Sequence, residues 1–135
     1  PIVMDNEKYE ISDEQPHIAR LTRTGVAAQK RGKCFEFTDA MMRTIWDGAT
    51  DDWNTDAHYA AAIEKAGMNA DEVMAEVAEQ GEMLEAMIAD NQKAFDAAVH
   101  WGVPCMVFDD ETFYGQDRMD VLLWRMKQKG LKARA

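Results

Sequence analysis

One stretch near the end of the chain differs from the helical pattern of the rest, and it restricts the possible folds most. Residues 105–108 read Cys-Met-Val-Phe, a short apolar run that Asp109 and Asp110 close. Such a run before a tight acidic turn predicts a strand that is covered on both faces and lies inside the fold. Residues 112–114 follow after three turn residues and can pair with it as a hairpin. Pro104 stands directly before the first strand, where a residue without N–H is tolerated.

The residues after this hairpin predict a final helix. Gly115 interrupts the second strand, and Asp117 is expected as the N-cap of a helix that runs to about Lys129. Asp120 stands three residues after this cap, where its carboxylate can reach back to the cap N–H. Gly130 suits the position just after the helix. We therefore expect a strand, strand, helix unit over residues 101–130 and a tail over residues 131–135.

Everything between residues 16 and 100 predicts helices, because apolar residues recur there at helical spacing. The expected helices end near residues 32, 48, 67, 81 and 100. Asn69 with Glu72 three residues later is a typical helix start, and Thr55 can cap the helix before it. Residues 1–15 carry five carboxylates against one lysine and show no helical period, which predicts an acidic arm or linker.

Composition excludes several classes of partner. The net charge of −10 argues against nucleic acid, because phosphate contacts require clustered Lys and Arg. No apolar run reaches membrane-spanning length and no signal peptide is visible, so we expect a soluble, cytoplasmic protein without a membrane partner. The three histidines are far apart in sequence and predict no metal site. His100 stands next to the Gly-Val-Pro turn and is a secondary candidate for the site.

The two cysteines, Cys34 and Cys105, form no Cys-x-x-Cys motif, and we expect both as reduced thiols. Cys34 begins an apolar helix stripe and is expected to be a small core residue. Cys105 follows Pro104 directly, and core packing is the plain interpretation of its position.

The segment Gly102-Val103-Pro104, with its strand, acidic turn and aromatic pair, continues into a Gly-Gln-Asp-Arg-Met-Asp block at residues 115–120. This order resembles the C-terminal end of the 2-hydroxychromene-2-carboxylate isomerases and the kappa-class glutathione transferases, which belong to the DsbA-like branch of the thioredoxin fold. The resemblance covers roughly residues 26–130. It implies a cis Val103–Pro104 bond, whereas spacing alone favours trans.

The fold class that the resemblance implies is α/β: the mostly helical C-terminal portion of a DsbA-like thioredoxin fold. A helical insertion domain over residues 16–100 precedes the β-hairpin and the C-terminal helix. A hairpin needs further strands beside it, and residues 1–15 cannot supply a β-α-β unit. The resemblance implies that a preceding β-α-β unit supplies the missing strands and carries the catalytic Ser or Cys, so we expect that residue upstream of Pro1. Because the hairpin lacks partner strands, we also expect this chain to form a homodimer or larger oligomer.

The resemblance implies a glutathione-dependent isomerase or transferase acting on hydrophobic aromatic substrates, with Val103, Pro104, Gln116 and Asp117 as glutathione-binding candidates. The chemistry of these residues agrees with glutathione binding. Beside Pro104 the backbone of Val103 can pair with an extended peptide. The N–H groups at the helix start, that of Arg118 among them, can hold a carboxylate, and Asp117 can hold an ammonium group. The plain alternative for Asp117 is an ordinary N-cap.

The stripe of Phe37, Met41 and Trp46 predicts either the core of the helical domain or an apolar pocket for the aromatic substrate. Two other functions stay open. A DsbA-like thiol-disulfide oxidoreductase shares the Val-Pro turn, and a non-catalytic helical interaction module would need no catalytic group. A lone Ser or Cys at the helix start upstream would indicate the isomerase, and a Cys-x-x-Cys would indicate the oxidoreductase.

Overall fold

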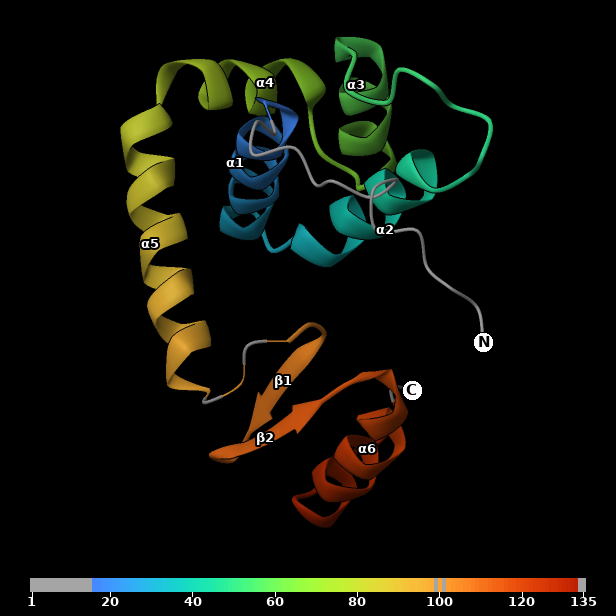
Figure 1. Cartoon of the computed structure of the whole chain (residues 1–135), viewed down its shortest axis with the longest axis vertical. Helices are drawn as coiled ribbons and strands as arrows, with labels where there is room; N and C mark the ends of the chain where they lie inside the picture. The colour runs from blue at the N-terminus through green and yellow to red at the C-terminus, as the bar shows by residue number, and fades with distance from the viewer. Residues whose placement is uncertain (1–15, 99, 101, 134–135) are drawn as a thin grey trace, which may run out of the picture. The chain divides into compact units, whose positions relative to one another are not determined.

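The computed structural model describes residues 16–98, 100 and 102–133 of the chain (Figure 1). The chain divides into two compact units, a helical unit that ends at Ile88 and a hairpin unit that begins at Ala89. The division falls inside one long helix rather than after residue 100, because the first half of that helix packs with the helical core. Each unit is described by itself. No helix in the described ranges is long and apolar enough to cross a membrane.

The helices closely follow the predicted pattern. They are α1 (Pro16–Lys30), α2 (Cys34–Ile45), α3 (Asp56–Lys65), α4 (Ala70–Glu79) and α5 (Gly81–Ala97). The predicted start of α4 is confirmed, because Asn69 Oδ1 accepts a 3.0 Å hydrogen bond from the Glu72 N–H. Thr55 occupies the N-cap position of α3 without a side-chain hydrogen bond. α5 ends three residues before His100, and the N–H of Ala98 bonds back to the Phe95 carbonyl.

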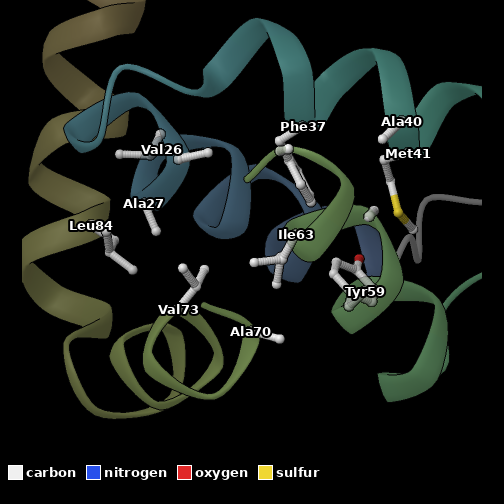
Figure 2. Close-up of a cluster of buried hydrophobic side chains, with 13 residues drawn as sticks. Val26, Ala27, Phe37, Ala40, Met41, Tyr59, Ile63, Ala70, Val73 and Leu84 are labelled. Atoms are coloured by element: carbon white, nitrogen blue, oxygen red, sulfur yellow. The ribbon is translucent and has the colours of Figure 1, made fainter. Parts of the chain in front are cut away.

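The core of the helical unit lies between α1 and the helices that surround it (Figure 2). α1 packs against α2 and α4, and α3 packs against the same two helices. Ala27 and Ala28 are fully buried, so the small face of α1 lets its neighbours come close. Larger side chains fill the space between the helices: Phe37, Met41, Tyr59, Ile63, Val73 and Leu84.

An ion-pair cluster around one buried carboxylate joins the C-terminal end of α1 to α4. Glu76 is 7% exposed and contacts both Lys30 and Arg31, with Arg31 Nη1 at 2.6 Å from its Oε2. Burial raises the pKa of Glu76, but the hydrogen bonds and charges of Lys30 and Arg31 together outweigh it and hold the pKa below its usual range. The carboxylate therefore stays charged inside the helical unit at neutral pH.

The hairpin unit contains β1 (Cys105–Phe108), β2 (Glu111–Tyr114), the short 3-10 turn η2 (Gln116–Arg118) and α6 (Met119–Gln128). The predicted hairpin is confirmed, with Met106 opposite Phe113. Its turn has two residues rather than three, because Asp109 and Asp110 both adopt positive φ, 54° and 61°. This pair of left-handed residues forms the tight turn that matches the twist of two antiparallel strands.

The expectation that β1 lies inside the fold is wrong for the described part of the chain. Only β2 pairs with it there, and Val107 is 56% exposed while the rest of the strand is half-buried. A strand becomes covered on both faces only when further strands or helices pack on it. In the hairpin unit Phe113 of β2 is buried, and Thr112 Oγ1 donates a 2.8 Å hydrogen bond to the Ala98 carbonyl.

Two ion pairs attach α6 to the turn end of the hairpin. Arg125 Nε donates a 2.9 Å hydrogen bond to Glu111, and Lys129 Nζ lies 2.5 Å from Asp109 Oδ2. The hydrogen bond from Lys129 lowers the pKa of Asp109. Gly130 ends α6 at φ 99°, as predicted, and the next N–H, that of Leu131, bonds back to the Met126 carbonyl.

Candidate functional site

The site is built around the peptide bond between Val103 and Pro104, which is cis as the resemblance implies. Val103 is 80% exposed. Within the described residues, neither the N–H nor the C=O of Val103 takes part in a backbone hydrogen bond. In that part of the chain this residue therefore presents one donor and one acceptor without a backbone partner at the end of β1, as an edge strand does.

A hydrogen bond links this segment to the residues before α6. The Pro104 carbonyl accepts a 2.9 Å bond from the Gly115 N–H, which extends the hairpin by one step beyond the pair Cys105 and Tyr114. Gln116 and Asp117 follow Gly115 directly. The four predicted ligand positions, Val103, Pro104, Gln116 and Asp117, therefore lie at the same end of the hairpin, opposite the Asp109–Asp110 turn.

The start of the last helix differs from the expectation. α6 begins at Met119, and the N–H of Arg118 donates to the Gly115 carbonyl at 3.1 Å. The sequence predicted that the Arg118 N–H is available to a ligand, but this hydrogen bond already uses it. The N–H groups of Gln116 and Asp117 come before the first bond of the 3-10 turn and have no backbone acceptor among the described residues. Gly115, at φ 92°, allows the chain to enter this turn.

Asp117 is not the N-cap of the helix. That position belongs to Arg118, whose side chain makes no capping bond, so the capping box expected from Asp117 and Asp120 does not form. The Asp117 side chain is 72% exposed, and its Oδ2 lies 3.6 Å from Arg118 Nε. Its carboxylate is therefore open to solvent beside a cation, with acceptor positions left for another group.

Three further residues hold the chain just before Val103. The N–H of Gly102 donates a 3.0 Å hydrogen bond to His100 Nδ1. The ring of His100 stacks on Tyr114, with 3.8 Å between ring centroids and 20° between planes. A Cβ on Gly102 would lie 2.2 Å from Tyr114 Cε2, so a side chain has no room there. His100 was only a secondary candidate in the sequence, and Tyr114 was not a site candidate.

The three predicted substrate-pocket residues all lie in the helical unit, but they differ in exposure. Phe37 and Met41 are 1% and 0% exposed and belong to its core (Figure 2). For these two residues the structure therefore agrees with the core interpretation rather than with the substrate pocket. Trp46 is 80% exposed. Cys34 is exposed at the first residue of α2, so its predicted core role is wrong, because the buried face of α2 begins only at Phe37. Cys105 is half-buried.

The helical unit also has a cavity of about 330 Å³. Arg20, on its wall, donates a 2.6 Å hydrogen bond to Asp56 and lies 4.2 Å above the ring of Tyr59. The two charged side chains that line this cavity, Arg20 and Asp56, are thus paired with each other, and we do not assign a ligand site here. In the described part of the chain, no group of three His, Cys, Asp or Glu side chains could hold a metal ion.

Comparison with protein families matches residues 7–127 to the model of the DSBA-like thioredoxin domain. No curated protein and no solved structure matches the chain. The family match covers most of the chain, including both the helical unit and the hairpin, and it agrees with a mostly helical α/β fold. The chain therefore belongs to the family of DSBA-like thioredoxin domains.

Proposed function

We propose that the open end of the hairpin binds glutathione, in a glutathione-dependent isomerase or transferase that acts on hydrophobic aromatic substrates. The observation that carries the proposal is the Val103 backbone, which makes no backbone hydrogen bond within the described ranges. It directly precedes Pro104, whose carbonyl is bonded to the Gly115 N–H just before Gln116 and Asp117. An extended peptide can pair with such a backbone by strand addition, which uses one donor and one acceptor.

The two charges of the γ-glutamyl group fit the groups that follow Gly115. The exposed carboxylate of Asp117 suits the ammonium group. The N–H groups of Gln116 and Asp117, which have no backbone acceptor among the described residues, suit the carboxylate. Arg118, which the sequence had offered as a donor, is replaced in this role by these two N–H groups. The chemical group that attacks the substrate is not assigned among the described residues.

Titration of the chain with glutathione, followed through the amide signals in NMR spectra, tests the proposal. Because Val103 and Asp117 are well exposed, we expect weak binding by this chain, with shifts of the Val103, Gln116 and Asp117 amides. Asp117→Asn keeps the shape and removes the charge, and it should weaken binding about five- to tenfold, as for loss of an exposed charge-assisted hydrogen bond. Asp110→Asn, in the turn at the other end of the hairpin, is the matched control and should leave the affinity unchanged.

A second function, thiol-disulfide exchange with peptide substrates, is favoured by the family itself. The Val103 backbone would bind any extended peptide in the same way, because strand addition uses main-chain hydrogen bonds. The titration separates the two functions. An oxidoreductase should bind a cysteine peptide without a γ-glutamyl group as tightly as glutathione, and Asp117→Asn should then have no effect.

A further inference from the structure

We infer that His100 is a positioning residue for the peptide-binding backbone, which it holds in place through Gly102 and Tyr114. The inference rests on the proposed function, because it concerns how Val103 is presented to an extended peptide. It is carried by one hydrogen bond, one ring stack and one close approach, all inside the hairpin unit.

The hydrogen bond fixes the chemical state in which His100 acts. The Gly102 N–H is the donor, so His100 Nδ1 must offer its lone pair and the ring proton lies on Nε2. The imidazole thus serves as an acceptor for the residue directly before Val103. A side chain without an acceptor at this position would leave the buried Gly102 N–H without this partner.

The ring stack fixes where this acceptor lies. Tyr114 is the last residue of β2 and pairs with Cys105, so its ring is anchored by the hairpin ladder. The His100 ring stacks on it at 3.8 Å, and Gly102 packs against the edge of the same Tyr114 ring. Because a Cβ at Gly102 would overlap Tyr114, glycine is required for this approach. Three residues from two segments thus hold the main chain before Val103.

The position of Val103 then follows from its two neighbours. Its own N–H and C=O make no backbone bond in the described ranges, and its side chain is exposed. On one side Gly102 is held by His100, and on the other the Pro104 carbonyl is held by Gly115. A donor and acceptor fixed in advance bind an extended peptide better than mobile ones, because less conformational entropy is lost on binding.

Two variants of the full chain distinguish the contribution of the His100 hydrogen-bond acceptor from that of its ring. His100→Phe keeps a ring to stack on Tyr114 and removes the acceptor. His100→Asn removes the ring, but its Oδ1 can accept from the N–H two residues later, as in an Asx turn. Each protein is measured twice: hydrogen exchange of the Gly102 amide without ligand, and glutathione affinity by NMR titration. Far-UV circular dichroism checks that each variant is folded.

We expect His100→Phe to speed exchange of the Gly102 amide and to weaken glutathione about three- to tenfold, which corresponds to the loss of one hydrogen bond. His100→Asn should restore both values to near those of the wild type. Wild-type affinity in a folded His100→Phe variant would overturn the inference and leave the proposed function intact. Equal losses in both variants, with unchanged Gly102 exchange, would also overturn it.

The titration of the wild type distinguishes failure of the inference from failure of the proposed function. A protected Gly102 amide without any glutathione binding would overturn the proposed function and with it the positioning role, while the hydrogen bond between His100 and Gly102 would stand. Glutathione binding by a wild type whose Gly102 amide exchanges freely would overturn only the inference.

Discussion

Arg31 Nη1 lies 2.6 Å from Oε2 of Glu76, and the carboxylate side chain is almost completely buried between α1 and α4. Lys30 contacts the other carboxylate oxygen. Because the partners are about one-third exposed, water can reach the cationic groups but hardly the carboxylate. The cluster therefore joins the two helices through a charge that is buried only on the acidic side.

The pH dependence of stability should reveal this cluster. The pKa of Glu76 is lower in the folded than in the unfolded chain, where it is about 4.3. Its stabilisation is thus fully present above pH 5 and is lost as the pH falls through the folded pKa. Glu76→Gln should lower the free energy of unfolding by about 1–3 kcal/mol at pH 7 and by less at pH 3. Urea unfolding at both pH values measures this.

Glu79→Gln is the matched control for that experiment, because Glu79 is exposed on the same helix. Its effect should stay within about 0.5 kcal/mol at either pH. A Glu76→Gln protein whose stability changes with pH in the same way as the wild type would show that the carboxylate makes no folded-state contribution.

The hydroxyl of Tyr59 gives a second prediction. It is buried, and the part of the chain that the structure describes offers it no hydrogen-bond partner. Tyr59→Phe removes the unpaired group and keeps the ring beneath Arg20. Thermal unfolding should therefore show unchanged stability or a gain of up to about 1 kcal/mol. A loss of more than 1 kcal/mol would mean that the hydroxyl has a partner after all.

Local sequence signals predicted those parts of the fold whose causes are local. Asn69 with Glu72 begins α4, and Gly130 ends α6, because a cap depends on residues within one turn. The cis bond before Pro104 followed from the resemblance, since spacing alone favours trans. The helical stripe of α2 left open whether Phe37 and Met41 form the core or a substrate pocket, and the structure places both in the core.

The errors arise where two local patterns compete, or where the structure depends on contacts beyond one turn. Asp117 satisfies the pattern of an N-cap, but a bond from Arg118 to Gly115 inserts a 3-10 turn and moves the helix start to Met119. β1 has the composition of a buried strand, yet burial depends on what packs against it. Nothing in the local pattern of Tyr114 indicates the stack with His100, because that contact arises when the hairpin closes.

Gly25 offers a stabilising substitution in the helical unit. It lies inside α1, its φ is not in the left-handed region, and nothing lies within 4 Å of the position of an added Cβ. Gly25→Ala should therefore raise the free energy of unfolding by about 0.5–1 kcal/mol, because alanine loses less backbone entropy in a helix. Chemical denaturation of the full chain measures this change. A loss of stability would indicate that α1 needs close contact at this position.

Gly115 should respond in the opposite way, and its response bears on the site. Its φ is 92°, and an added Cβ would lie 2.5 Å from Asp117 Oδ1. Gly115→Ala should cost about 1–3 kcal/mol of stability and should also displace the Asp117 carboxylate. Gly67→Ala is the control, because Gly67 also has positive φ, 80°, but open space around it. Both variants should lose stability in urea unfolding, and only Gly115→Ala should also weaken glutathione. Equal glutathione affinity in the two variants would show that Gly115 and Asp117 do not belong to the binding site.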